Sequence, residues 1–325
     1  MKTEGHDEEL DHYNKAVRIA EKEGNMETKA NKLSAIAFIY FNRGDYENAL
    51  KHLKQAFNIY TDLGAMGEKA TILNNIAMIY KIKGDYDSAL KHYEKALKIG
   101  EQLEKIDIKT TALNNIGMIY REKGDSKHAL KVYKQILDIT ASLGDIGIKA
   151  TVLNNIGMIY ADKGENEVAL KNYYQSLEIA RRLENKKGEA TALNNIGLIN
   201  DAEGEYESAL ENYKKALVLF RQLGSVREQG TILSNIGSIF KIKEDYENAL
   251  KYYTHAIEID SHIGDKRGMA TDFNNIGIIY NLKGNIKSAL ISLRKSKKAY
   301  LDIGLDRMAQ KVQENIDHIK KKHHK

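Results

Sequence analysis

Residues 113–120 read Leu-Asn-Asn-Ile-Gly-Met-Ile-Tyr, and the same eight residues recur at 153–160. Close versions begin at positions 33, 73, 193, 233 and 273, so the string returns every forty residues without an insertion or a deletion. A second string, Gly-Asp-Tyr-Asp-Ser-Ala-Leu at 84–90, follows the first in a similar form each time. Self-similarity at a fixed period of this size indicates a repeat architecture.

The forty-residue spacing divides the chain into full repeats with a half-repeat at each end. An N-terminal half-repeat occupies 7–26, and 307–325 forms a C-terminal capping helix with a basic tail. A length of 325 residues alone would suggest two domains, but the repeats predict one array over 1–325. The full repeats are 27–66, 67–106, 107–146, 147–186, 187–226, 227–266 and 267–306.

Each repeat is expected to fold as two helices. The apolar residues within 73–80 fall at i, i+3, i+4 and i+7, and those within 89–97 follow the same spacing, which is that of one helical face. Gly84 suits the left-handed end of the first helix, and Asp85 suits the cap of the second. Small residues such as Gly117 would let the two helices approach closely. The pattern predicts an all-α fold.

This pattern resembles the tetratricopeptide repeat. The residues that carry the resemblance are Leu113, Ile116, Gly117, Tyr120, Gly124, Asp125, Ala129, Tyr133 and Ile136. The resemblance implies an α-solenoid, a right-handed superhelix of antiparallel helix pairs, with a concave groove lined by the first helices. The period exceeds the usual 34, as in the repeats of kinesin light chains and Pins-type adaptors.

Two features depart from the family pattern. The proline that closes the family's repeat is absent, and the chain contains no proline at all. Glu244 occupies a position where the other repeats carry Gly. A left-handed conformation at Glu244 should cost roughly 1 kcal/mol.

The composition and the motifs of the chain argue against several classes of function. The absence of cysteine excludes disulfides, thiolate metal sites and a cysteine nucleophile. No phosphate loop, G-x-S-x-G elbow or H-E-x-x-H helix occurs, so we expect neither an enzyme nor a cofactor. No stretch has the 18 or more apolar residues of a membrane helix, and the N-terminus does not read as a signal peptide. We therefore expect a cytoplasmic protein without a membrane partner.

The net charge of +5 comes from the C-terminus, since residues 294–325 carry ten Lys or Arg against four Asp or Glu. Nucleic-acid binding by the whole protein is therefore not expected. The tail could bind acidic partners, but we favour a cap, because cations suit a helix C-terminus. Asp317 in the place of Gly277 supports that interpretation. The N-terminal half-repeat lacks a preceding partner, so it either caps the array or mediates self-association.

The candidate groove consists of the first-helix positions that packing does not use, which are those of Thr71, Asn74, Asn75, Met78, Lys81 and Ile82. Side-chain amides can pair with both C=O and N–H of an extended peptide backbone. The alternative is a structural ladder of asparagines between neighbouring helices. One column contains Asn75, Asn115, Asn155, Asn195, Asn235 and Asn275, and the other contains Asn74, Asn114, Asn154, Asn194 and Asn274.

A further column reads Phe38, Met78, Met118, Met158, Leu198, Ser238 and Ile278. Methionines suit adaptable apolar contacts, although such stripes are more often core. Later in each first helix lie Phe41, Ile82, Glu122, Asp162, Asp201, Ile242 and Leu282. We expect a ligand with an apolar anchor at the N-terminal end and a basic residue near Glu122 and Asp162.

His12, His52 and His92 recur at the repeat spacing. Successive repeats lie too far apart for one zinc ion to bind all three, so we expect solvated histidines. The whole pattern predicts a protein-protein interaction scaffold or adaptor that binds a protein or peptide ligand. The alternative is a sensory or regulatory module that switches a signalling partner when a ligand binds.

Overall fold

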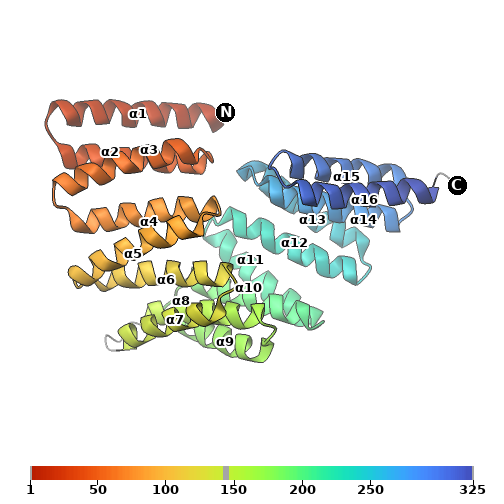
Figure 1. Cartoon of the computed structure of the whole chain (residues 1–325). Coiled ribbons are helices and arrows are strands. Elements are labelled where there is room, and N and C mark those ends of the chain that lie inside the picture. Colours follow the sequence, from red (N-terminus) through yellow and green to blue (C-terminus); the bar gives the residue numbers. More distant parts are fainter. Residues whose placement is uncertain (1, 142–145, 324–325) are drawn as a thin grey trace. The chain divides into compact units, whose positions relative to one another are not determined.

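The computed structural model describes residues 2–141 and 146–323, and every regular element in them is an α-helix (Figure 1). The helices are α1 (Lys2–Lys22), α2 (Met26–Asn42), α3 (Tyr46–Asp62), α4 (Met66–Ile82), α5 (Tyr86–Gln102), α6 (Ile106–Glu122), α7 (Ser126–Ala141), α8 (Ile146–Asp162), α9 (Asn166–Arg182), α10 (Lys186–Ala202), α11 (Tyr206–Gln222), α12 (Val226–Ile242), α13 (Tyr246–Ile263), α14 (Lys266–Leu282), α15 (Ile286–Leu301) and α16 (Asp306–His323). The prediction of an all-α fold of helix pairs is confirmed.

The even-numbered helices from α2 to α16 are the first helices of the repeats, and the odd-numbered helices from α3 to α15 are the second helices. The chain forms two compact units, Met1–Ile159 and Tyr160–Lys325, whose boundary lies inside α8. Consecutive helices pack against one another from α1 to α7 and from α9 to α16. A second helix contacts the first helix of its own repeat and the first helix of the next, as in α4, α5 and α6.

The repeated turn residues act as the sequence predicts. Gly84 adopts a left-handed φ of 77°, and the Asp85 carboxylate accepts a hydrogen bond from the Ser88 backbone N–H at 3.0 Å. Glu244 also adopts a left-handed φ, of 60°, and so do Glu104 and Glu184 at the turns between repeats. The turn glycine Gly144 lies outside the described residues. The backbone therefore keeps the same turn whether or not glycine is present.

Close contact between a small residue and a large one joins the two helices of a repeat. A Cβ atom on Gly117 would lie 2.8 Å from the Tyr133 ring, and one on Gly197 would lie 2.8 Å from the Tyr213 ring. Both tyrosine side chains are fully buried. Because protein interiors are close-packed, this contact fixes how each second helix rotates against its first helix.

The two ends of the chain differ from the internal repeats. α1 begins at Lys2, several residues earlier than the sequence predicts, and it buries Leu10 and Ala20. Ile19 on α1 is 55% exposed. A role for this face in self-association stays a prediction. At the other end, α16 packs Val312 and Ile316 into the core, whereas Asp317 on its outer face is exposed.

Within the described residues, every helix is either too short or too polar to cross a lipid bilayer.

Replacing Glu244 by Gly should increase the free energy of unfolding by about 1 kcal/mol, because glycine adopts a left-handed φ without a Cβ penalty. Urea denaturation followed by circular dichroism measures the change. The control Glu244→Gln keeps the Cβ atom and should show no such gain. Equal stability of the wild-type and Glu244→Gly proteins would contradict the assignment of strain to this turn.

Candidate functional site

Helix α4 carries a narrow stripe of side chains that packing leaves exposed or half-buried. In α4 it consists of Thr71, Asn75, Met78 and Ile82, spaced at i, i+4, i+7 and i+11. Met78 is 38% exposed and Ile82 is also exposed, whereas Leu73 on the opposite face is buried. We call these four positions, and their equivalents forty residues apart, the first-helix stripe. Helical periodicity places them on one face of each first helix.

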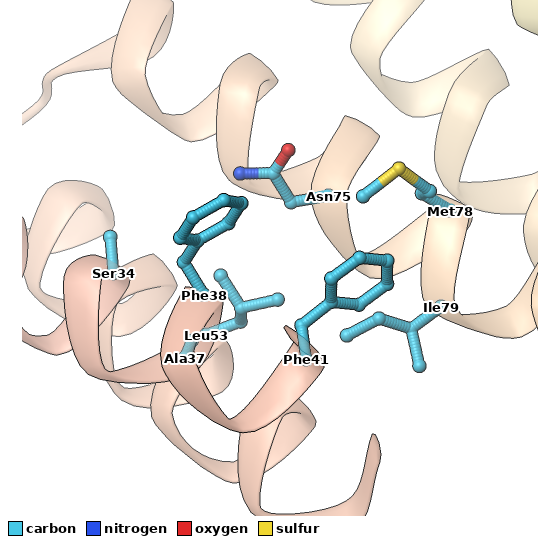
Figure 2. A pocket seen from close by; sticks show the side chains of 8 residues that line it. All are labelled: Ser34, Ala37, Phe38, Phe41, Leu53, Asn75, Met78 and Ile79. Atoms are coloured by element: carbon cyan, nitrogen blue, oxygen red, sulfur yellow. The ribbon is translucent and has the colours of Figure 1, made fainter. Parts of the chain in front are cut away.

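The stripe of the first compact unit contains an apolar pocket of about 120 Å³ (Figure 2). Phe38 and Phe41 from α2 line one side, and Asn75 and Met78 from α4 line the other. Phe38 is 62% exposed, although it is a large apolar side chain. The remaining lining residues are Ser34, Ala37, Leu53 and Ile79. The pocket thus combines aromatic and thioether surface with one amide.

The other methionines of this column are less exposed than Met78. Met118 and Met158 are half-buried, with Asn114 Nδ2 lying 3.8 Å from the Met118 sulfur and Arg121 lying 3.9 Å from the Met158 sulfur. Leu198 is exposed, but Ser238 turns its hydroxyl to the buried Tyr253 hydroxyl at 2.9 Å. The column is therefore an open apolar surface at some repeats and part of the packing at others.

The asparagines of the two columns differ in their surroundings, and their role in binding a peptide stays a prediction. Asn155 Nδ2 donates to Asn114 Oδ1 at 2.7 Å, which links two repeats as a structural ladder would. Asn154 and Asn195 are buried. The carbonyl oxygens of Asn74, Asn194 and Asn274 are buried and accept no hydrogen bond from the described residues. Asn75 and Asn235 instead line surface cavities. Asn115 and Asn275 are half-buried, and the Lys241 ammonium group donates a hydrogen bond to Asn275 Oδ1 at 2.9 Å.

The two residues of the predicted acidic centre, Glu122 and Asp162, have different surroundings. Glu122 already pairs with Lys81 of the preceding first helix, with 3.0 Å between the charged atoms. Asp162 is exposed and belongs to the other compact unit, so a basic ligand residue shared with Glu122 stays a prediction. By the forty-residue spacing, Phe41 and Asp201 lie one position before the equivalents of Ile82. Burial raises the pKa of Asp201.

The histidine prediction is wrong for two of the three residues. His52 stacks on Tyr40 and His92 stacks on Tyr80, with 5.3 Å between ring centroids in both pairs. Both histidine rings are half-buried, since the neighbouring first helix presents a tyrosine to each. His12 on α1 remains exposed, as predicted.

Two buried aspartates in the second compact unit escaped the sequence reasoning. Asp272 on α14 has 0% exposure, and Asp260 on α13 is also buried. The column of Asp272 contains only apolar residues in five other repeats, namely Ile72, Ala112, Val152, Ala192 and Ile232. Comparing the repeats column by column would have revealed this break, because an aspartate is seldom buried without a partner.

Burial dominates the electrostatics of both carboxyl groups. It raises the pKa of Asp272 to about 7, although a hydrogen bond from the Ser234 hydroxyl at 2.7 Å opposes the shift. Burial also raises the pKa of Asp260 to about 6, where Asp265 adds to the shift and Arg227 opposes it. The protein thus folds around two acids whose charged forms are poorly solvated.

Replacing Asp272 by Asn should stabilise the protein at pH 8 and have little effect near pH 4. Between the ordinary pKa of 3.8 and the raised value of about 7, folding takes up a proton at Asp272, so the wild type loses stability as pH rises through this range. The loss should be at most about 1.4 kcal/mol per pH unit.

Urea denaturation of both proteins across this pH range measures the difference. The control Glu258→Gln removes an exposed carboxylate from α13 and should give no comparable gain. Parallel stability curves for Asp272→Asn and the wild type would show that Asp272 is not held in a raised-pKa environment.

The chain was compared with models of known protein families, with curated proteins and with solved structures. The tetratricopeptide repeat family model matches residues 28–102, 68–142, 149–222 and 228–302, which together make up well over half of the chain. No match is found among curated proteins.

Several solved structures share the fold. The apo form of the quorum sensor NprR from B. thuringiensis superposes with a TM-score of 0.69 at 18% identity, covering 90% of this chain and 83% of NprR. A Rap protein complexed with competence and sporulation factor gives a TM-score of 0.57 at 18% identity, with 98% of both chains covered.

A signal-transduction ATPase of the STAND class with a tetratricopeptide repeat sensor, from Pyrococcus horikoshii, gives a TM-score of 0.62 at 22% identity. The match covers 88% of this chain but only 44% of the ATPase. Identities this low show a common fold alone, and the narrower resemblance to kinesin light chain and Pins-type repeats stays a prediction.

Proposed function

Because the chain belongs to the tetratricopeptide repeat family, we propose that it is a protein-interaction adaptor that binds an extended peptide or partner segment on the first-helix stripe. The observation that supports this most is the apolar pocket between α2 and α4, where Phe38 stays exposed beside Met78. An exposed patch of large apolar residues with a polar rim is typical of an interaction surface.

The chemistry of the pocket suits an apolar anchor residue next to peptide backbone. Phe38, Phe41 and Met78 provide adaptable apolar surface for a side chain. Asn75 lies at the same pocket, and its amide has both donors and an acceptor for a backbone that enters beside the anchor. This agrees with the apolar anchor that the sequence predicts at the N-terminal end of the groove.

Replacing Phe38 by Ala should weaken peptide binding about tenfold or more, because it removes the most exposed apolar wall of the pocket. Peptides selected from a random library against the wild-type protein serve as probes, with affinity measured by fluorescence anisotropy. Tyr174→Ala is the matched control, since Tyr174 is also an exposed aromatic residue but lies on a second helix, α9.

The proposal predicts that Tyr174→Ala binds the selected peptides as tightly as the wild type. Equal affinities of Phe38→Ala and the wild type would contradict binding at the pocket. Circular dichroism of both variants shows that the fold is intact.

A second candidate function is a regulatory module that switches a signalling partner when a ligand binds. It is favoured by the similar structures, one of which is a quorum sensor and another of which carries a tetratricopeptide repeat sensor. Both functions use the same stripe, but only the regulatory module requires the ligand to alter the packing of the repeats. Small-angle scattering with and without a selected peptide distinguishes a changed shape from an unchanged one.

The remaining aspects of the proposal follow from the sequence. We propose a non-enzymatic, cytoplasmic role with a protein or peptide as the partner and without nucleic acid. The C-terminal lysines, including Lys320 and Lys321, lie in the last helical turns of α16, where cations favour the helix dipole.

A further inference from the structure

We propose that the cavity between α12, α13 and α14 binds a cationic organic group, a guanidinium or an alkylammonium, through the carboxylates of Asp260 and Asp272. The cavity has a volume of about 280 Å³. Its lining residues are Thr231, Ser234, Asn235, Asp260, Asp265, Arg267, Gly268, Thr271 and Asp272. This site lies in the second compact unit, whereas the apolar pocket lies in the first.

Asp272 provides the first anchor. Its side chain is 0% exposed, and one carboxylate oxygen accepts from Ser234 Oγ at 2.7 Å. The other oxygen, Oδ1, is buried and accepts no hydrogen bond from the described residues. An unpaired buried carboxylate oxygen carries a desolvation cost, which a donor entering the cavity would remove. The hydroxyl of Ser234 fixes the orientation of the carboxylate.

Asp260 provides the second anchor, and two glycines make room for it. A Cβ atom on Gly268 would lie 2.0 Å from Asp260 Oδ2, and one on Gly230 would lie 2.6 Å from Oδ1. Alanine occupies the position of Gly230 in most other repeats, such as Ala70 and Ala190. Because Gly230 and Gly268 have no Cβ atom, the Asp260 carboxylate fits at a position where other repeats carry different side chains.

The remaining charges at the cavity do not neutralise these two carboxyl groups by direct contact. The Asp265 carboxylate already has two partners. It accepts a hydrogen bond from the Gly268 backbone N–H at 2.9 Å and forms an ion pair with Arg227 at 2.6 Å. Arg267 lines the cavity but is exposed. A cation that enters the cavity would therefore meet two buried acids, with one arginine already paired and the other in solvent.

The preceding repeat shows what the same location looks like without the acids. A cavity of about 290 Å³ lies between α10, α11 and α12, where Phe220 and Ile232 occupy the places of Asp260 and Asp272. The hollow between consecutive repeats is therefore a general feature, whereas the paired carboxyl groups are specific to the last two full repeats. A phenyl ring and a branched alkyl group cannot bind a cation by charge.

An organic cation fits better than a metal ion. Within the described residues, no group of three or more His, Cys, Asp or Glu side chains converges as metal ligands would. A guanidinium or ammonium group instead needs only two or three acceptors and leaves room for an alkyl chain. Thr231 and Thr271 also line the cavity. Their hydroxyl groups donate to the backbone carbonyls of Arg227 and Arg267, which leaves oxygen lone pairs that can accept.

The cation could come from a free amine or from an arginine or lysine of a bound segment, and calorimetric titration distinguishes the two. The probes are methylguanidine and the peptide acetyl-Ala-Ala-Arg-Ala-Ala-amide. The same peptide with citrulline in place of arginine has nearly the same shape without the charge. We expect at least one arginine-like probe to bind, and the citrulline peptide to bind at least tenfold more weakly than the arginine peptide.

Asp272→Asn and Asp260→Asn should each reduce the affinity of the bound probe at least tenfold. Asp272→Asn is expected to fold at least as stably as the wild type, so its loss of binding cannot come from unfolding. Glu258→Gln removes an exposed negative charge from α13 outside the cavity and should bind like the wild type.

Binding of methylguanidine alone would indicate a free cation as the source, and preference for the arginine peptide would indicate a basic side chain. Absence of binding by every charged probe would overturn the proposal. Equal affinities of Asp272→Asn and the wild type would overturn it as well. Neither outcome depends on the Phe38 pocket, so the adaptor proposal is tested separately.

Discussion

The close contact between the two helices of each repeat is the constraint on which the rest of the structure depends. Gly117 approaches Tyr133 so closely that one added methyl group would lie 2.8 Å from the ring, and Gly197 meets Tyr213 in the same way. This contact fixes the rotation of each second helix and therefore the buried face of each first helix. The first-helix stripe is the face that remains, so its position follows from packing.

Because the repeats share one geometry, a residue that departs from its column stands out physically. Glu244 keeps the left-handed turn that glycine adopts elsewhere. Asp272 replaces an apolar residue at a position with no solvent access. The first departure carries a local conformational cost, whereas the second carries a desolvation cost unless a cation neutralises it. A repeat array can tolerate such local costs, since its stability is spread over many neighbouring contacts.

The sequence predicts the helices, their turns and their caps, because each depends on residues close together in the chain. Asp85 caps a residue three positions later in the chain, and Gly84 forms the turn directly before it. It does not predict which asparagine faces solvent, since the bond between Asn114 and Asn155 depends on how neighbouring repeats are spaced. The stacking of His52 on Tyr40 has the same origin. Asp260 and Asp272 were missed because charged residues are ordinarily assigned to the surface.

The most direct test of the central claim, that the first-helix stripe is the binding surface, is hydroxyl-radical footprinting of the methionines. Met78 lies on the stripe and is 38% exposed, and Met308 lies on the capping helix α16 and is 40% exposed, so the two are matched in accessibility. Saturation with a library-selected peptide should slow the oxidation of Met78 and leave that of Met308 unchanged. Oxidation of Met78 at the same rate with and without bound peptide would contradict the account.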